Sequence, residues 1–582
     1  MRLLSRLTAA VCLLVPLAQG QTAPGSLVLS GNYQNGQFDS LTFVNSVVGW
    51  DMFFNAGFLG ASTVIGNVEA GQIWFEHEVF VRPPEATTGF HTYINPAPGS
   101  VNQLDYHATM VGNVLAGSGY VVNNGNPEYT YAGLGMAPAA TLVSAGIATE
   151  FSATDPGSFA TTQASVVTPY QAFFQGVGLG AGVARPDVIN SSWGGGDPAA
   201  VSNEALAIDG LARQNSSVAL VVAAGNGGSD AVSFPASGYN NISVGSLGGA
   251  SFLQPSDYTS RGMTDFYNPK TGVTLTGVRA AVDIAAPGER YFLAAYLGNS
   301  GTLGASAEFA SLIQQPSPKD LYFLNQDGTS FASPIVAGGI ALLKDVAKTD
   351  LVWNFNGNPA ALDTRVIKSV LMAGAQKTVG WNNGQNASNV TTQALDLQTG
   401  AGAMDLVGTS DVYFFGTRDV AGTNGGQIAN YGWDSATINL GAALEYAFAE
   451  TFTEDMTLTV ALNWFAVRGF DDLNQTGTDL AFSNLDLQVW LLDDNGEFSI
   501  KVGESMSTYN NTEFLRFDTL AAGHYGLRVV FNGMVYDTTN AVTDEQYAMA
   551  WRAVAIPEPG GLTYLVSILI IGLRRRRSPI NL

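Results

Sequence analysis

The 582-residue sequence has a single cysteine and few charged side chains. Charged residues make up 13% of the chain, about half the usual share of a globular domain, whereas 46% of the residues are hydrophobic. So much apolar material excludes a wholly disordered chain. Basic residues are also scarce, because 25 Lys and Arg stand against 48 Asp and Glu, a formal net charge of −23. A nucleic-acid-binding function is excluded, since contacts to a phosphate backbone require clustered Lys and Arg.

The single cysteine, Cys12, lies in a segment with the order of a secretory signal peptide. Two arginines precede the apolar run Leu7–Leu17, and small residues follow up to Gly20. We predict a signal peptide over residues 1–20. Its removal would leave a mature chain without a disulfide, a thiolate nucleophile or a Cys-based metal site.

The C-terminal segment 556–582 combines a Pro-Glu-Pro triplet, an uncharged stretch at 560–573 and four consecutive arginines. The stretch is short for a membrane span, and a plain tail anchor is one interpretation. The order resembles the PEP-CTERM sorting signal of Gram-negative bacteria. The resemblance implies an exosortase-type enzyme as partner, transient membrane contact, export through the inner membrane, and a place at the cell surface or in the extracellular matrix. Loss of both ends removes six arginines and one glutamate, which changes the net charge from −23 to about −28.

Between these ends the pattern changes once, near residue 409. Up to that point short apolar runs that end in Gly, Asn or Ser alternate with helix-like segments such as Ala199–Gln214 and Ser333–Ala347. The alternation predicts an α/β domain with a parallel sheet and a site at the carboxyl ends of its strands. Four runs are the predicted buried strands: Thr63–Ile65, Asp187–Asn190, Val218–Ala223 and Asn241–Val244.

After residue 409 the sequence predicts an all-β sandwich. Five β-like runs follow one another, separated by turns such as Asp493–Gly496: Ala436–Leu444, Met456–Phe465, Leu485–Leu492, Asn511–Leu520 and Gly523–Phe531. We place the first domain at residues 24–408 and the second at 409–553. The Asn- and Gln-rich segment 382–398 is the best candidate for a linker.

The strongest chemical motif is Gly328–Pro334, which opens an apolar helical segment. A serine at the start of a helix, here Ser330, lies beside backbone N–H groups that stabilise developing negative charge. A plain helix N-cap in a protein core is the alternative that spacing alone leaves open.

This segment resembles the nucleophile motif of the subtilisin-like serine peptidases, the subtilases. Further blocks resemble that family's motifs in the same chain order, acid, then His, then Ser. They are His107–Gly112, Gly135–Ala140, Asn190–Gly195, Val222–Gly227, Phe234–Ala236 and Asp283–Gly288. The resemblance runs from about Val47 to about Asp405. It implies a subtilisin-like parallel sheet flanked by helices, and a serine endopeptidase with polypeptide substrates.

Carried over residue by residue, the resemblance assigns four catalytic positions. Ser330 is the nucleophile and His107 the general base, while Asn226 donates to the oxyanion. As a single residue, Asn226 in Gly-Asn-Gly is also good turn chemistry. Ser192, Trp193, Gly194 and Gly195 correspond to the strand that borders the substrate, with Trp193 as a bulky apolar part of the cleft wall.

The acid departs from the family pattern, because Glu69-Ala70-Gly71 stands where Asp-Ser/Thr-Gly is expected. A glutamate can still orient an imidazole, but its extra methylene must be absorbed by the backbone or by the rotamer. Glu76, Glu78 and Asp105 are rival acids that we expect to be solvated surface charges. The substitution leaves a second hypothesis open, in which the chain is a catalytically inactive subtilase-fold protein of the cell surface or matrix.

We expect no cofactor and no metal site, because no His/Cys/Glu cluster has zinc spacing. Acidic loops such as Asp471–Asn474 could hold calcium, although turns explain them more simply. Segments of the second domain, around Leu485, Glu513 and Tyr525, resemble jelly-roll domains that follow some secreted subtilases. The resemblance implies a role in stabilisation or in surface and substrate contact, and a structural role for His524.

Overall fold

The computed structural model describes residues 33–34, 37–38, 44–81, 91–94, 96–122, 130–152, 157–296, 313–314, 322–349, 355, 358–420 and 424–556. The predicted signal peptide at 1–20 lies outside the described residues. So does the predicted sorting signal from residue 557 onward, including the stretch at 560–573.

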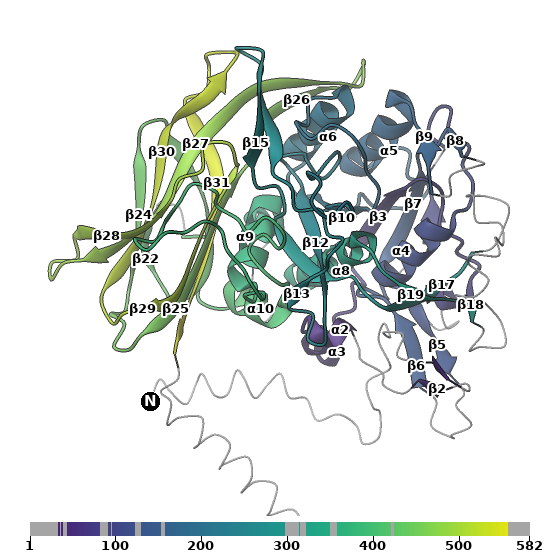
Figure 1. Cartoon of the computed structure of the whole chain (residues 1–582), viewed down its shortest axis with the longest axis horizontal. Helices are drawn as coiled ribbons and strands as arrows, with labels where there is room; N and C mark the ends of the chain where they lie inside the picture. Colours follow the sequence, from purple (N-terminus) through teal and green to yellow (C-terminus); the bar gives the residue numbers. More distant parts are fainter. Residues whose placement is uncertain are drawn as a thin grey trace, which may run out of the picture.

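The first part of the chain is built on an eight-stranded sheet in the order β13-β12-β11-β10-β3-β7-β4, with β16 paired to β12 (Figure 1). All of its pairings are parallel except that of β13 with β12. The four predicted strands correspond to four of these strands. The sheet consists of β3 (Val64–Glu69), β4 (His91–Tyr93), β7 (Thr141–Gly146), β10 (Val188–Ser191), β11 (Ala219–Ala223), β12 (Ile242–Gly248), β13 (Gln254–Pro255) and β16 (Ile284–Pro287).

Helices cover both faces of this sheet, as its fully buried strands require. Alternate residues of β3 belong to different cores: Ile65 joins α4 and α8, whereas Val64 and Val68 join α5 and α6. The four helices are α4 (Tyr106–Ala116), α5 (Gln163–Gln175), α6 (Asn203–Gln214) and α8 (Thr329–Thr349). The prediction for α6 starts four residues too early, because the Ser202 side chain caps the helix by accepting from the Ala205 N–H at 3.2 Å.

The chain order reverses between β3 and β10. From β3 the chain continues to β4 and β7 on one side, then crosses to β10 on the other side and proceeds outward to β12. Loops that follow two such strands diverge and leave a crevice at their carboxyl ends, which is where open α/β sheets bind ligands. Glu69 ends β3 and Ser192 follows β10, so both lie at this crevice.

Shorter elements surround the sheet. Near the N-terminus they are β1 (Tyr33–Gln34), β2 (Gln37–Phe38), α2 (Val44–Val47), α3 (Asp51–Ala56) and η1 (Glu78–Phe80). Three two-stranded pairs are β5 (Ser118–Val122) with β6 (Thr130–Leu134), β8 (Glu150–Phe151) with β9 (Phe159–Ala160), and β14 (Thr264–Asn268) with β15 (Val273–Arg279). A small sheet joins β17 (Tyr291–Ala294), β18 (Ile313–Gln314) and β19 (Tyr322–Gln326), and η2 (Pro359–Leu362), α9 (Thr364–Gly374) and α10 (Leu406–Phe414) follow.

The second part is a two-sheet β sandwich around a separate hydrophobic core. The seven-stranded sheet contains β20 (Val390–Thr391), β22 (Gly426–Ile428), β24 (Ala443–Phe448), β26 (Val467–Asp471), β27 (Thr476–Leu492), β28 (Phe498–Ser505) and β30 (Tyr525–Asp537). The five-stranded sheet contains β21 (Thr417–Arg418), β23 (Tyr431–Asn439), β25 (Met456–Trp464), β29 (Thr512–Leu520) and β31 (Asp544–Ala555). The predicted strand Ala436–Leu444 is wrong, because a turn at residues 440–442 divides it between two sheets.

The two parts share a hydrophobic layer. Helices α9 and α10 lie against the five-stranded sheet, and Trp433, Ala461 and Ala548 of that sheet belong to the same core cluster as helices α4 and α8 of the first part. The predicted boundary between residues 408 and 409 falls inside α10. The segment 382–398 is not a linker: its asparagines form local turns, and β20 pairs with β28 of the sandwich.

One helix among the described residues, α8, has the length and apolar composition of a membrane span. Its residues are almost entirely buried against the sheet and α4, so it is the core helix of the fold.

Candidate active site

Three elements of the crevice each contribute one side chain to the candidate site. Glu69 is the last residue of β3, while His107 and Ser330 are the second residues of α4 and α8. Helix starts leave N–H groups without intrahelical acceptors, so the elements that present His107 and Ser330 both favour negative charge nearby.

Both carboxylate oxygens of Glu69 are engaged. Oε2 lies 3.0 Å from His107 Nδ1, and Oε1 accepts the backbone N–H of Ser192 at 2.8 Å. Glu69 is only 1% exposed, so these two contacts determine where the carboxylate points. The additional methylene of glutamate is thereby accommodated by a carboxylate that spans two donors, one on α4 and one after β10. A proton on Nδ1 leaves Nε2 of the ring as the free basic nitrogen.

His107 combines a buried partner with an accessible ring, because 27% of its side chain is exposed. Burial by itself lowers the pKa of this ring, since it disfavours the charged form. The charge of Glu69, its hydrogen bond and the more distant charge of Asp105 outweigh burial, so the pKa of His107 lies above the ordinary 6.5.

Asp105 is not the solvated charge that the sequence suggested. It is 2% exposed and caps α4, where its Oδ2 accepts the Ala108 N–H at 3.0 Å. Burial raises the pKa of this carboxyl, although His107 and the cap hydrogen bonds oppose the effect. An aspartate directly before a helical segment is a known capping signal, so the capping role of Asp105 could have been predicted from the sequence. Of the other rivals, Glu76 is exposed and Glu78 accepts the Tyr322 hydroxyl at 2.8 Å.

The Ser330 hydroxyl bonds to Ser192, the residue that follows β10. Oγ donates to the Ser192 carbonyl at 3.3 Å, and the Ser192 hydroxyl donates to the Ser330 carbonyl at 3.0 Å. No hydrogen bond joins Ser330 to His107 in the described part of the chain, although the His107 ring lies 6.1 Å from that of Phe331 on the same helix. Such bonds are often long before substrate binds. Ser192 thus contacts both the acid and the serine.

Asn226 presents its amide nitrogen to solvent. Its Oδ1 accepts both the Thr329 N–H and the Thr329 hydroxyl at 2.9 Å. A backbone N–H can only donate, so the atom facing it must be the oxygen, and Nδ2 is left as a donor beside Ser330. Asn226 is exposed, so this donor is open to a bound group.

The predicted substrate strand lies beside these groups. Gly194 and Gly195 are exposed, and Trp193 is half-buried with its ring against Phe234 and Phe159. A cavity of about 230 Å³ opens between this strand and His107. Aromatic residues that the sequence did not single out line it: Tyr106, Phe151 and Phe159. Tyr170 of α5 supports the strand from below through a 2.7 Å hydrogen bond between its hydroxyl and Ser191 Oγ.

The described residues contain no group of three or more His, Cys, Asp or Glu side chains that could hold a metal ion. The acidic loop at Asp471 is a turn, because its carboxylate accepts the N–H groups of Leu473 and Asn474. His524 bonds the Phe448 carbonyl at 2.8 Å in the sandwich, away from the crevice.

A carboxylate, an imidazole and a serine at the switch point of a parallel sheet define the class of Ser-His-acid hydrolases. The model of the Subtilase family (Peptidase_S8) matches residues 72–402, more than half of the sequence. The chain therefore belongs to the subtilase family. The match begins three residues after Glu69, so the acid lies just outside the matched part.

Similar proteins are peptidases. An "Extracellular protease" of Xanthomonas campestris pv. campestris is 33% identical over 189 residues, which cover 32% of this chain. The chain spans 25% of that relative. Two solved structures are similar at low identity. The prenylagaramide maturation protease PagA is 18% identical with a TM-score of 0.40, over 62% of this chain and 96% of its own. The self-cleaved protease domain of PatA is 20% identical with a TM-score of 0.39, over 61% of this chain and 97% of its own.

Proposed function

We propose that this protein is an exported subtilisin-like serine endopeptidase that uses Glu69, His107 and Ser330 as its triad. The observation that carries the proposal is the 3.0 Å contact between Glu69 Oε2 and His107 Nδ1. An inactive scaffold has no need to keep a buried carboxylate aligned with an exposed imidazole. The contact therefore favours the enzyme over the scaffold.

The first half of the reaction forms an acyl-enzyme on Ser330. The Ser330 hydroxyl turns from the Ser192 carbonyl to His107 Nε2, transfers its proton there, and Oγ bonds to the peptide carbonyl carbon. The carbonyl oxygen becomes an oxyanion that accepts from Asn226 Nδ2 and the Ser330 N–H. Protonated His107, stabilised by Glu69, then gives its proton to the leaving amine as the C–N bond breaks.

The second half regenerates the enzyme. A water molecule gives a proton to His107 and its oxygen attacks the acyl carbon. The ester bond to Ser330 Oγ then breaks, and the proton returns to this oxygen. Ser192–Gly195 would pair with an extended substrate backbone as an added strand, while Trp193 contributes apolar wall. A body charge of about −28 would disfavour strongly acidic substrates at low salt.

The place of action follows from the two ends of the sequence. We propose export by the signal peptide at 1–20 and sorting through the segment 556–582, with an exosortase-type enzyme as partner. The name of the Xanthomonas relative is consistent with secretion. Replacement of the four terminal arginines by serine should leave the unprocessed chain with its tail attached. Mass spectrometry of the C-terminal peptide from intact cells reads this out, and unchanged processing would contradict the sorting proposal.

A fluorophosphonate probe tests the chemistry directly. Under native conditions the wild type should be labelled at Ser330, and Ser330→Ala should not be labelled. Ser229→Ala is the matched control, because this exposed serine lies near Asn226 but outside the triad. A folded wild type that resists labelling would reject the peptidase and support the scaffold. Cleavage of a peptide library by the unlabelled wild type would then define its side-chain preference.

A further inference from the structure

The wall behind the substrate strand is the turn Ser233–Asn241. Phe234 of this turn pairs with the strand through both of its backbone groups. The Gly195 N–H donates to the Phe234 carbonyl at 2.8 Å, and the Phe234 N–H donates to the Gly196 carbonyl at 2.9 Å. The Phe234 and Trp193 rings also meet at 5.5 Å. Any shift of Phe234 therefore moves the edge to which an extended peptide would bind.

The turn itself is internally braced. The Ser237 N–H donates to the Ser233 carbonyl at 3.0 Å, and the Asn241 amide donates to the Pro235 carbonyl at 2.8 Å. Arg279 donates to the Ser237 carbonyl from β15. These bonds couple Phe234 to Tyr239 and Asn240 at the far end of the turn.

That far end is held by the β sandwich. Asn240 exchanges two hydrogen bonds with Ala466, one through each atom of its amide, at 3.0 and 2.9 Å. The Asn511 amide donates to the Tyr239 carbonyl at 2.8 Å, and the Phe482 ring lies 5.2 Å from the Tyr239 ring. The turn thus belongs to the peptidase part by sequence, and its far end also contacts the sandwich.

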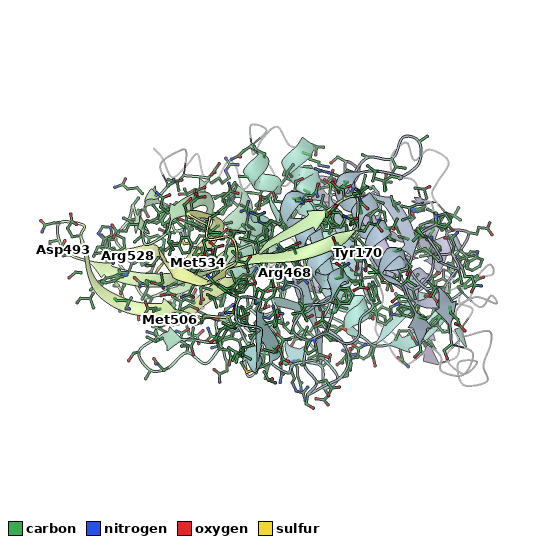
Figure 2. All side chains as sticks on the ribbon, turned by 90° about the horizontal axis from the view of Figure 1, so that it is seen from above. Tyr170, Arg468, Asp493, Met506, Arg528 and Met534 are labelled. Atoms are coloured by element: carbon green, nitrogen blue, oxygen red, sulfur yellow. The ribbon has the colours of Figure 1, made fainter. Side chains whose placement is uncertain are left out.

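Arg468 is the centre of this attachment. Figure 2 shows it on the long hairpin β26–β27, between the outer strands of the sandwich and Tyr170 of α5. It is 1% exposed and binds Asp209 of α6 at 2.9 Å and Asp479 of β27 at 3.2 Å. Asp209 in turn accepts the N–H groups of Tyr239 and Asn240 at 2.9 and 3.0 Å. The guanidinium also lies over the Tyr239 ring, 4.7 Å from its centre, with Arg279 at 3.9 Å from the same ring.

We propose that Arg468 is a positioning residue for the substrate cleft. It acts through Asp209 and the turn Ser233–Asn241 on Phe234 and hence on Trp193–Gly196, without touching the triad. The inference rests on the proposed peptidase function for its kinetic test but not for its structural one. It assigns the sandwich a part in peptide binding, in addition to stability.

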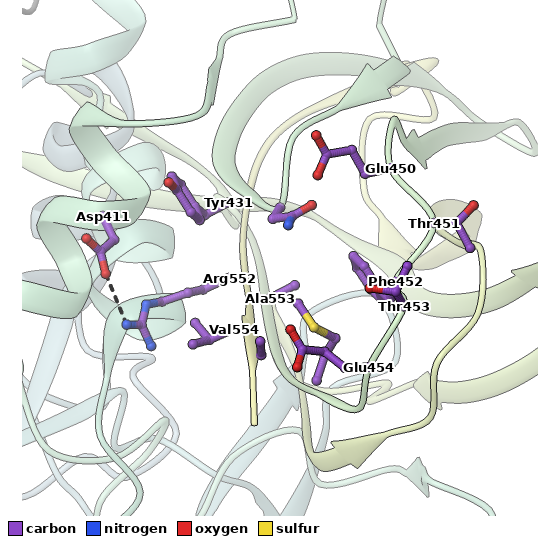
Figure 3. Close-up of a pocket in the computed structure, with 13 residues that line it drawn as sticks. Asp411, Tyr431, Glu450, Thr451, Phe452, Thr453, Glu454, Arg552, Ala553 and Val554 are labelled. Atoms are coloured by element: carbon purple, nitrogen blue, oxygen red, sulfur yellow. Dashed lines mark hydrogen bonds and ion pairs between the residues drawn. The ribbon is translucent and has the colours of Figure 1, made fainter. Parts of the chain in front are cut away.

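The kinetic test compares two arginines of the sandwich that pair with the peptidase part. Arg552 binds Asp411 of α10 at 3.0 Å beside a cavity of about 420 Å³ (Figure 3), whose lining residues include none of the triad, the substrate strand or the turn Ser233–Asn241, so Arg552→Met is the control for Arg468→Met. Arg468→Met should raise KM for an extended peptide by about tenfold, because a misplaced edge weakens substrate positioning. Fluorophosphonate labelling of Ser330 needs no extended peptide and should change by less than about threefold. Arg552→Met should change neither.

A merely structural role predicts a different pattern, in which labelling and hydrolysis fall together with the folded fraction. If labelling and hydrolysis by Arg468→Met fall by the same factor, the proposal is overturned. An unchanged KM would also overturn it. If Arg468→Met does not fold, Arg468→Lys replaces it, because a lysine keeps a cation between the two carboxylates but loses the planar fork. An intermediate rise in KM is then expected, and no rise would again contradict the proposal.

Hydrogen exchange tests the coupling without activity. In peptides covering 193–196 and 233–241, the amides of Gly195 and Phe234 should exchange about tenfold faster in Arg468→Met than in the wild type or Arg552→Met. Equal rates would refute the positioning role. The two proposals can also fail separately. If the probe does not label the folded wild type, but Arg468→Met still exchanges faster than the wild type, the peptidase function is refuted and the coupling stands.

Discussion

Glu69 and Asp209 are buried carboxylates with the same kind of hydrogen-bonded surroundings but different roles. Each is 1% exposed, each accepts at least one backbone N–H, and each binds a nitrogen of a cationic or basic side chain. Their partners differ. His107 is a quarter exposed and can lose its proton, whereas Arg468 is fully buried and keeps its charge at any working pH.

The difference between the two partners corresponds to a difference in role. Burial makes both carboxylates intolerant of losing a partner, since an uncompensated buried charge is costly. At the crevice the buried carboxylate orients an imidazole that can gain and lose a proton. At the interface it fixes two parts of the chain to each other. The partner's ability to titrate thus decides which role a buried carboxylate has.

The largest expected effect comes from Glu69. Glu69→Gln keeps the length of the side chain but removes the charge and can favour the wrong tautomer of His107, so kcat should fall by about 10⁴-fold. Glu69→Asp should also lose activity, by about 10²-fold, because the shorter side chain withdraws the carboxylate from His107 Nδ1. Steady-state hydrolysis of a fluorogenic peptide measures both. An aspartate variant as active as the wild type would show that the glutamate is not required by this backbone.

The next effect is on stability. Asp209→Ala removes one of the two carboxylates that pair with Arg468 and the acceptor of two backbone N–H groups, so the free energy of unfolding should fall by about 3–5 kcal/mol. Asp518→Ala is the control: its exposed pair with Lys377 should contribute about 0–1 kcal/mol. Urea unfolding followed by tryptophan fluorescence gives both values. Equal losses would mean that burial does not distinguish the two pairs.

Asn226 is expected to affect rate without affecting the fold. Asn226→Asp keeps an acceptor for the Thr329 N–H but replaces the donor by a negative charge, so kcat should fall by about 10²–10³-fold with little change in KM. Thermal unfolding checks that the variant is intact. A change confined to KM would place Asn226 in ground-state binding, outside the oxyanion site.

The smallest effect is a shift in pH dependence. The general base must be neutral, so the labelling rate of Ser330 should rise with pH through the raised pKa of His107, with a midpoint above 6.5. Glu69→Gln removes the main cause of the increase and should lower the midpoint. Asp105→Asn, which keeps the helix cap, should lower it less. In the same way, stability from the Glu69–His107 pair is fully present below about pH 6.5 and is lost as pH rises through the folded-state pKa. If neither variant changes the midpoint of the labelling rate, a group other than His107 controls this pH dependence.

Much of the crevice could be predicted from the sequence because its residues are presented by local elements. Strand ends and helix starts have recognisable signals, and the order of Glu69, His107 and Ser330 along the chain agrees with the subtilase pattern. The distance between the Glu69 carboxylate and His107 could not be predicted, since it depends on the Ser192 N–H, which a parallel strand places beside β3.

The attachment of the sandwich was beyond sequence reasoning for a different reason. Arg468 and Asp209 are 259 positions apart, and nothing in the pattern near either residue indicates its partner. The segment 382–398 has the composition of a linker, yet its Asn side chains accept from the backbone of its own turns, and its strand β20 pairs with β28 of the sandwich. Composition reports the lack of apolar side chains but not these local bonds.

The turn Ser233–Asn241 acquires its last contacts after the triad has been synthesised. The turn is completed by Ala466 and Asn511, which follow Asn240 and Tyr239 by 226 and 272 positions. Both residues are synthesised after the whole triad, and the N-terminal part of a chain generally folds first during synthesis. A newly made chain should therefore carry an assembled triad before it carries a finished cleft. We expect chains sampled during cell-free synthesis to gain fluorophosphonate labelling before peptide hydrolysis, and simultaneous appearance of the two would contradict this order.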